Sequence, residues 1–139
     1  DLSYAGGGVA MVVRNNGRPL VVAGGIAGLV AVHDCDDSTC LSSSVASLGN
    51  PTTNALGATL RADGRALLVF GAPGTNGVQV FDCSTSTCVA GSSRSVLMGG
   101  NFGSYVALAV RDDGRPVVAY YDADNDDLRL HICANPDCT

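Results

Sequence analysis

The sequence contains no lysine, no glutamate and no tryptophan among its 139 residues. Of the strong helix formers, this leaves mainly alanine, leucine and arginine. Glycine, valine, serine, threonine and aspartate are abundant instead, and such a composition favours strands joined by turns. The sequence also lacks an apolar run approaching the roughly 18 residues of a membrane-spanning helix. We therefore expect an all-β chain without a transmembrane helix.

Positive charge is scarce as well. All 8 basic residues are arginine and all 13 acidic residues are aspartate, which gives a net charge of −5. A nucleic-acid surface needs a clustered basic face, so the balance argues against a nucleic-acid partner. The chain is 46% hydrophobic and 15% charged, whereas a disordered tail has low hydrophobicity and high charge. The length fits one folded domain, residues 1–139.

Two sequence markers recur three times. The first is a turn of the form Arg-x-x-Gly-Arg that starts at Arg14, Arg61 and Arg111, in steps of 47 and 50 residues. The second is Cys-x4-Cys, which starts at positions 35, 83 and 133, in steps of 48 and 50 residues. Two independent markers with one period indicate three copies of a unit of about 48 residues. We place the repeats at approximately 1–48, 49–98 and 99–139.

Each repeat contains short apolar segments that are typical of strands. The expected strands of the three repeats are a, at 9–13, 58–60 and 106–110, and b, at 20–22, 66–70 and 117–121. Strand c is expected at 78–81 and 128–132 in the second and third repeats, and a weaker strand d at 44–48 and 94–98 in the first and second repeats. Strands a and b are continuously apolar, which predicts burial on both faces, whereas the alternation in c predicts one solvated face. Asn-Gly or Asp-Gly stands between a and b in every repeat. These pairs predict type I′ hairpin turns with positive φ at both central residues.

The third repeat has no segment for a strand d, because the sequence ends one residue after Cys138. The first residues do not supply it, since aligning Arg14 with Arg111 sets Asp1 opposite Met98. We therefore expect that the sequence is cut at a repeat boundary and that the last repeat lacks its outer strand.

One run of residues in the third repeat suggests a family. The run from 113 to 122 reads Asp-Gly-Arg-Pro-Val-Val-Ala-Tyr-Tyr-Asp, and 127–133 reads Asp-Leu-Arg-Leu-His-Ile-Cys. This pattern resembles a repeat of secreted bacterial β-propeller proteins, in which an Asp-Gly-x-Pro hairpin leads into an apolar-Tyr-Tyr-Asp strand and then into a strand closed by Cys-x4-Cys. The other repeats depart from it, with Ala23-Gly24-Gly25 and Phe70-Gly71-Ala72 in place of Tyr-Tyr-Asp.

The resemblance implies a β-propeller-like fold of three four-stranded blades. Propellers usually have four to eight blades. The chain would then be part of a longer propeller, or two chains would close a six-bladed ring. Exposed blade edges invite pairing with another chain. A β-trefoil, which also consists of three repeats of about this size, is the alternative fold.

The six cysteines stand in three equivalent pairs. They allow 15 connectivities, and repeat equivalence favours the disulfides Cys35–Cys40, Cys83–Cys88 and Cys133–Cys138. The alternative is a set of metal thiolates, but Cys-x4-Cys is wider than the usual start of a zinc site and no His-x3–5-His follows. Because disulfides need an oxidising compartment, we expect a secreted, periplasmic or cell-surface protein.

Equivalent positions also supply two sets of candidate site residues. His33 and His131 stand two residues before the first cysteine of their repeats, where the second repeat has Phe81. A position shared with phenylalanine is interpreted as a packing position. In a propeller, Arg14, Arg61 and Arg111 would converge around the axis and bind a carboxylate. We favour the other interpretation, in which each arginine packs over its own hairpin and pairs with a nearby aspartate.

The acidic loop of the third repeat is a weak candidate for a metal site. Asp122, Asp124 and Asp126 place carboxylates at alternate positions, and oxygen ligands at that spacing can wrap Ca²⁺. The equivalent loops of the other repeats have no acidic residues. We therefore favour a solvated turn and expect no other cofactor.

The sequence offers no recognisable catalytic motif. It has no phosphate-binding Gly-Lys-Ser/Thr loop, no Gly-x-Ser-x-Gly and no nucleophile beside either histidine. We expect an extracellular structural or recognition module without catalysis of its own, which self-associates or joins further blades of the same protein. It could also bind a carbohydrate or a protein, and Tyr4, Tyr105, Tyr120 and Tyr121 are the available tyrosines. The alternative is a fragment of a secreted propeller hydrolase or carbohydrate-binding lectin whose site lies in other blades.

Overall fold

The computed structural model describes residues 7–24, 30–48, 55–72, 77–98 and 100–139. The regular elements in these segments are strands, so the chain is all-β as its composition predicts. In the described segments, no helix is long and apolar enough to cross a membrane.

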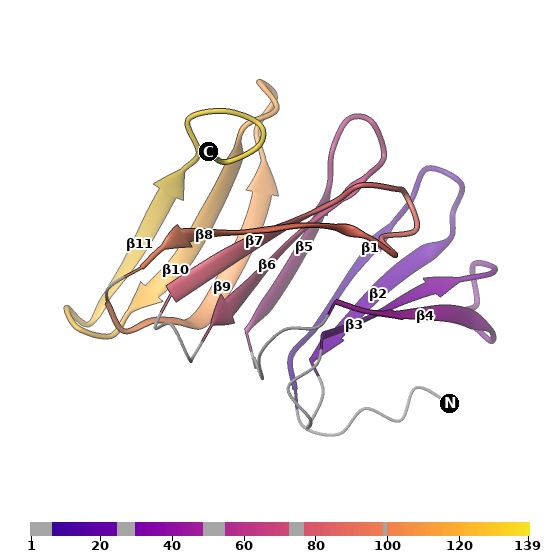
Figure 1. Ribbon diagram of the computed structural model, residues 1–139, viewed down its shortest axis with the longest axis horizontal. Coiled ribbons are helices and arrows are strands. Elements are labelled where there is room, and N and C mark those ends of the chain that lie inside the picture. Colours follow the sequence, from indigo (N-terminus) through magenta and orange to yellow (C-terminus); the bar gives the residue numbers. More distant parts are fainter. Residues whose placement is uncertain (1–6, 25–29, 49–54, 73–76, 99) are drawn as a thin grey trace.

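The strands form three antiparallel sheets (Figure 1). The first sheet consists of β1 (Val9–Val13), β2 (Pro19–Gly24), β3 (Val30–Cys35) and β4 (Ser43–Ser47). The second consists of β5 (Leu56–Leu60), β6 (Ala66–Ala72), β7 (Gly77–Cys83) and β8 (Gly91–Leu97). The third consists of β9 (Phe102–Val110), β10 (Pro116–Asp122) and β11 (Asp127–Ile132). Strands that follow each other within a sheet are also hydrogen-bonded neighbours, so each sheet is a simple meander.

The turn between the first two strands is the same in all three sheets. Its glycines, Gly17, Gly64 and Gly114, have φ of +77°, +80° and +79°. In the first sheet, the Gly17 N–H donates to the Arg14 carbonyl at 2.8 Å, and the Arg14 N–H donates to the Arg18 carbonyl at 3.1 Å. This pattern is a type I turn followed by a left-handed glycine, which makes a three-residue hairpin loop. The prediction of type I′ turns was wrong, because the residue before each glycine does not have a positive φ.

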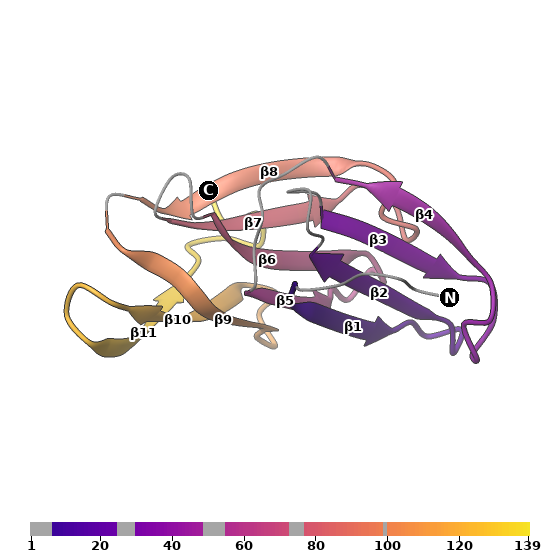
Figure 2. The ribbon, with the colours of Figure 1, turned by 90° about the horizontal axis from the view of Figure 1, so that it is seen from below.

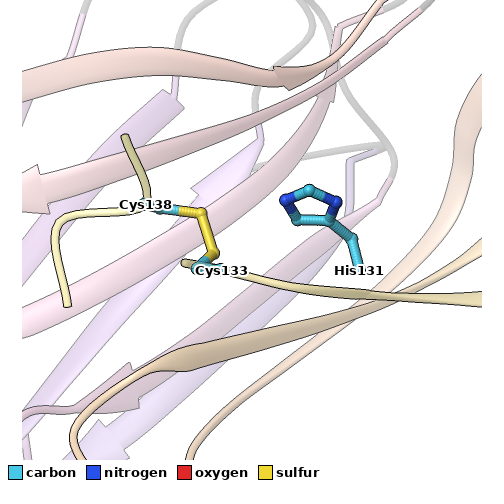
Figure 3. A group of neighbouring side chains, drawn as sticks. All are labelled: His131, Cys133 and Cys138. Atoms are coloured by element: carbon cyan, nitrogen blue, oxygen red, sulfur yellow. A yellow bond between two sulfur atoms is a disulfide. The ribbon is translucent and has the colours of Figure 1, made fainter. Parts of the chain in front are cut away.

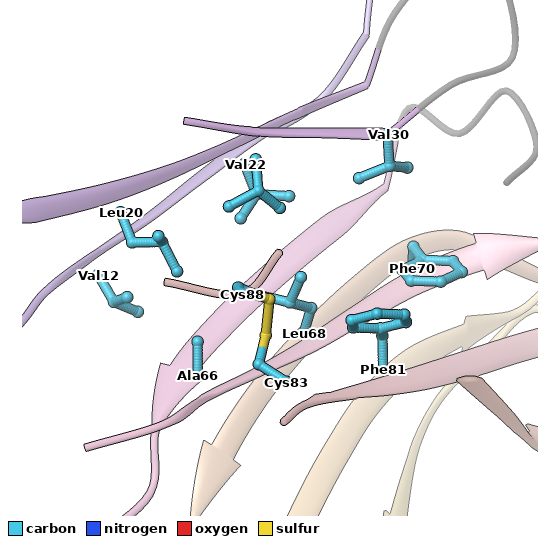
Figure 4. Close-up of a cluster of buried hydrophobic side chains, with 11 residues drawn as sticks. Val12, Leu20, Val22, Val30, Ala66, Leu68, Phe70, Phe81, Cys83 and Cys88 are labelled. Carbon is cyan, nitrogen blue, oxygen red and sulfur yellow. A yellow bond between two sulfur atoms is a disulfide. The ribbon is translucent and has the colours of Figure 1, made fainter. Parts of the chain in front are cut away.

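The three sheets stand side by side, and their first strands are adjacent (Figures 1 and 2). β5 lies next to both β1 and β9, so the second sheet is the middle of the stack. An apolar cluster fills the space between the first and second sheets (Figure 4). It brings Leu20 and Val22 of β2 together with Leu68 and Phe70 of β6, and it includes the Cys83–Cys88 disulfide.

A second apolar cluster lies between the second and third sheets. Leu67 and Val69 of β6 pack there with Val118 and Tyr120 of β10. Successive side chains of a strand point to opposite faces, so β6 contributes alternate residues to the two clusters. This explains why residues 66–70 form a continuous apolar run in which every side chain is buried.

The burial of the other strands corrects two predictions. Strands of type a were expected to be buried on both faces, but Val9, Met11 and Val13 of β1 are exposed. These side chains lie on the face of the first sheet that points away from the stack. Strands of type c were expected to have one solvated face. Instead, no residue of β3 or β7 is exposed, whereas the apolar Leu128 and Leu130 of β11 are exposed.

Candidate functional site

In each sheet, a turn that is closed by a disulfide follows the third strand. The disulfides are Cys35–Cys40, Cys83–Cys88 and Cys133–Cys138, as repeat equivalence predicts. The second cysteine of each pair is left-handed, with φ of +53°, +56° and +58°. These turns lie at the same end of the sheets as the hairpins. For example, Nε of Arg18 donates to the Cys35 carbonyl at 2.7 Å, and Nη1 of Arg65 donates to the Cys83 carbonyl at 3.1 Å.

The equivalent arginines pair with aspartates of their own repeats. Arg61 donates two hydrogen bonds to Asp82, from Nε to Oδ1 and from Nη2 to Oδ2, both 3.1 Å long. Arg14 pairs with the equivalent Asp34 through a single contact, from Nη2 to Oδ1, and both of these side chains are buried. Two of the three guanidiniums are therefore held by the aspartate that precedes the first cysteine of their repeat, which agrees with the interpretation that we favoured.

The third arginine has a different environment. Ile132 occupies the position that corresponds to Asp34 and Asp82. Arg111 is consequently more exposed, and its Nη2 lies 3.5 Å from Oδ2 of Asp113 in its own hairpin. Sequence reasoning missed this pattern, although the signal was present: an aspartate directly precedes the first cysteine in two repeats and is absent from the third.

A cleft of about 450 Å³ lies between the hairpins of the second and third sheets. Its ionisable lining residues are Arg61, Arg65, Arg111, Asp63, Asp112 and Asp137. The hydrogen bond from the backbone N–H of Arg65, followed by that from its side chain, lowers the pKa of Asp63. Three positive and three negative groups balance, so this cleft has no net charge with which to attract an ionic ligand.

A second cleft, of about 360 Å³, lies where the first strands of the three sheets begin. It is lined by Gly8 and Val9, by Ala55 and Leu56, and by residues 104–106. The lining contains the hydroxyl groups of Ser104 and Tyr105 but no carboxylate, imidazole or thiol. Glycoside hydrolysis usually needs two carboxyl groups that flank the scissile bond. The described residues do not supply such a pair in this cleft.

The Tyr-Tyr-Asp motif of the third repeat organises the turn between β10 and β11. Tyr120 is buried, and its ring meets that of Phe102 edge to face, with centroids 5.4 Å apart. The Tyr121 hydroxyl donates to Oδ1 of Asp126, and this hydrogen bond raises the pKa of Tyr121. Asp122 is only 1% exposed. These contacts give all three motif residues a structural role; Tyr4 lies outside the described residues.

The three carboxylates of the calcium candidate accept hydrogen bonds from different groups. Oδ2 of Asp122 accepts from Nδ2 of Asn125 at 2.8 Å and lies 2.9 Å from Nε of Arg129. The hydrogen bond from Asn125 is the main cause that lowers the pKa of Asp122. Asp124 accepts instead from a backbone N–H, that of Asn101, and Asp126 accepts from Tyr121. At least one oxygen of each carboxylate is thus engaged by a donor within the chain.

The two equivalent histidines occupy different surroundings. His33 is 5% exposed and lies between Val21 and Val45 in a row across the first sheet. Its Nδ1 is 3.4 Å from Oγ of Ser43, and burial lowers the pKa of His33. These surroundings are those of the packing position that the sequence suggests.

His131 lies beside the third disulfide. One of its ring nitrogens and the sulfurs of Cys133 and Cys138 are within 4.8 Å of one another (Figure 3). The sulfurs are bonded to each other, whereas a cysteine metal ligand is a thiolate. The oxidised turn therefore offers an incoming metal one ligand, the imidazole, in place of three.

Comparison with solved structures identifies a similar fold. The chain superimposes on a novel α-L-arabinofuranosidase from Clostridium thermocellum, a β-propeller glycoside hydrolase, with a TM-score of 0.66 and 16% sequence identity. The alignment covers 93% of this chain and 47% of that chain, so the chain spans about half the length of the enzyme. Neither the family models nor the curated proteins that were searched give a match. At this identity the likeness shows the fold alone.

Proposed function

We propose that the chain is an extracellular structural or recognition module without catalysis of its own. The observation that carries this proposal is the cleft at the first strands, where the three sheets meet. Its described lining has no carboxylate, imidazole or thiol, which are the groups that most often serve as acid, base or nucleophile, and it offers only the hydroxyl groups of Ser104 and Tyr105. The more ionisable cleft between the hairpins is balanced in charge, and its Arg61 is held by Asp82.

For this module we favour a propeller-like arrangement of three blades over a trefoil. Each sheet is formed by one continuous stretch of chain, and the first strands of the three sheets are neighbours. Radial repetition of separate small sheets is the architecture of a propeller. The likeness to a β-propeller enzyme supports the same arrangement.

The proposed location follows from the disulfides. Three short cystine turns persist in an oxidising environment and are rare in the cytosol. A secreted, periplasmic or cell-surface protein fits this chemistry.

An activity assay tests the absence of catalysis. The purified, oxidised chain is incubated with an aryl α-L-arabinofuranoside and with arabinan, and product release is followed by absorbance and chromatography. We expect no release above the rate without protein. Turnover that co-purifies with the chain and rises in proportion to its concentration would overturn the proposal.

A second candidate function is that of a part of a carbohydrate-binding lectin or hydrolase whose complete site needs further blades. Two observations favour it: the fold match covers 47% of a glycoside hydrolase, and Tyr105, at the edge of the cleft, is 73% exposed. An exposed aromatic ring offers an apolar platform with a polar tip. Calorimetric titration with arabino-oligosaccharides tests it. Binding that Tyr105→Ala abolishes and Tyr105→Phe keeps would support this function, whereas binding that is unchanged in Tyr105→Ala would contradict the role of Tyr105.

A further inference from the structure

The stack of sheets has two apolar ends. On the first sheet, Val9, Met11, Val13 and Val45 are exposed on the side away from the second sheet; we call these four residues the first outer face. On the third sheet, Tyr105, Leu128, Leu130 and Ile132 are exposed on the opposite side and form the last outer face. Apolar side chains grouped on one sheet face normally pack against another layer.

The repeat shows what covers the first outer face. Val9, Met11 and Val13 stand 47 positions before Leu56, Ala58 and Leu60. In the second sheet these equivalents pack against the first sheet. In the third sheet the next equivalents, Val106, Leu108 and Val110, pack against the second. The first outer face is therefore the repeat's surface for a preceding sheet.

The last outer face has the complementary character. Leu128 and Leu130 stand 50 positions after Val78 and Val80, which pack against the third sheet. Val80 is 2% exposed, whereas Leu130 is 66% exposed. The same repeat position is thus buried wherever a following sheet exists and open at the end of the stack. Each chain carries both halves of one interface.

Charged residues at the hairpin end of the sheets are also complementary between the last sheet of one chain and the first sheet of another. Nη1 of Arg14 donates to the Ser86 carbonyl in the disulfide turn of the following sheet, at 3.3 Å. The equivalent of Arg14 in the third sheet is Arg111, and the equivalent of Ser86 in a first sheet is Ser38. Ser38 follows Asp36 and Asp37 directly. A first sheet placed after the third sheet would therefore set an acidic turn opposite the exposed guanidinium of Arg111.

We propose that a second copy of this chain docks head to tail, with its first outer face on the last outer face of its partner. A second copy supplies both surfaces, and the contact continues the interface that already joins the sheets within one chain. Such a contact is heterologous, so it closes into a ring if the rotation allows and otherwise grows. Two copies would bring six sheets together, which lies within the usual four to eight blades of a propeller. This inference rests on the proposed module function and names its partner.

Sedimentation velocity with one variant per face tests the docking. Met11→Asp places a charge on the first outer face, and Leu130→Asp places one on the last. Both side chains are exposed in the single chain, so folding should tolerate the changes. We expect the wild type to sediment at twice the 14.0 kDa chain mass or more, and each variant to sediment as a single chain. An equimolar mixture of the two variants should restore a two-chain species, because each supplies the intact face that the other lacks.

The control is Val89→Asp, which changes an apolar side chain between β7 and β8 that is 58% exposed and lies on neither outer face. It should assemble like the wild type, and Val9→Asp and Leu128→Asp should repeat the two face results. Circular dichroism checks that each variant is folded. A monomeric wild type, a single-face variant that still dimerises, or a mixture that stays monomeric would each overturn the docking. A monomer without hydrolase activity would leave the module function standing, whereas turnover would overturn that function at any mass.

Discussion

Arg61 and Asp82 form a two-pronged ion pair at the end of the second sheet, with both N···O distances equal to 3.1 Å. Arg65 adds a longer contact of 3.7 Å to the same carboxylate. Arg14 and Asp34 form the equivalent pair in the first sheet through a single contact, whereas the third sheet has Arg111 and Ile132 at these positions. The pair therefore occurs in the two sheets that another sheet follows in the stack, and Arg111 at the open end lacks it.

Removing the carboxylate of this pair should be costly. Asp82→Ala leaves the largely buried guanidinium of Arg61 without its partner; breaking a fully buried pair in this way typically costs about 3–5 kcal/mol, which sets the upper bound for this pair. Urea unfolding followed by circular dichroism measures the loss. The matched double variant, Arg61→Leu with Asp82→Ile, removes both charges and should unfold close to the wild type. A loss below about 1 kcal/mol for Asp82→Ala would show that the pair is not a buried, coupled unit.

The hairpin glycines should be replaceable only by residues that accept a left-handed backbone. Gly64 has φ of +80°, and a side chain added there would meet no atom within 4 Å. Gly64→Ala should therefore be destabilised by backbone strain alone, by about 1 kcal/mol. Gly64→Asn should lose less, since asparagine tolerates this region. Equal losses for the two variants in urea unfolding would contradict the turn geometry.

His33 should make stability depend on pH near neutrality. Burial lowers the pKa of His33 in the folded chain, so the unfolded chain binds the proton more readily. The free energy of unfolding should therefore fall as the pH drops from about 7 through the unfolded pKa of about 6.5 towards the lower folded value. His33→Phe, which borrows the side chain of the equivalent Phe81, should flatten this dependence. Urea midpoints of the two proteins between neutral and mildly acidic pH give the comparison, and parallel curves would contradict the assignment.

Calcium should leave the chain's stability unchanged. Asp122, Asp124 and Asp126 already accept hydrogen bonds from donors within the chain. A ligand that bound the folded state at a hundred times its Kd would add about 2.7 kcal/mol. We expect the same thermal midpoint in CaCl₂, in MgCl₂ and in EGTA. A midpoint that rises with CaCl₂ alone, and does not rise in Asp122→Asn, would establish a calcium site at this loop.

The strands and the disulfides could be predicted because they recur at equivalent positions of the three repeats. The spacing of the cysteines was enough to assign all three disulfides. The apolar segments located the strands, although β5 and β9 start earlier than expected, at Leu56 and Phe102. Local sequence sets these features, because a short strand, a tight turn and a disulfide between cysteines five positions apart all depend on neighbouring residues in the chain. The limits of the repeats as domain units stay a prediction.

The burial of individual strands depends on contacts between sheets, which the sequence of a single strand does not determine. An apolar β11 looks like an apolar β7 in sequence. Val80 of β7 is nevertheless buried, because the third sheet packs on it, whereas Leu130 of β11 is exposed on the outer side of the third sheet. The role of Asp82 depends on the pairing of β6 with β7, which sets it opposite Leu67. The turn type was missed because Asn-Gly and Asp-Gly also fit the three-residue loop, in which only the glycine is left-handed.

The head-to-tail contact can be tested at one pair of positions. A Cβ placed on Gly57 would lie 3.4 Å from the backbone N of Leu108 and 3.6 Å from Cα of Ala107, across the boundary between the second and third sheets. The repeat maps Gly57 to Ala107, and it maps Ala107 and its neighbour Leu108 to Ala10 and Met11. In the docked pair, Ala107 of one copy should therefore lie against Met11 of the other, close enough for a disulfide, which needs Cα atoms within about 7 Å.

The decisive measurement is oxidative cross-linking of an equimolar mixture of Ala107→Cys and Met11→Cys chains, read by intact mass without reduction. The account predicts a mixed disulfide at twice the 14.0 kDa chain mass, formed faster than in a control mixture of Ala107→Cys with Val89→Cys. Cross-linking that is no faster than in the control would contradict the docking of one copy on the next.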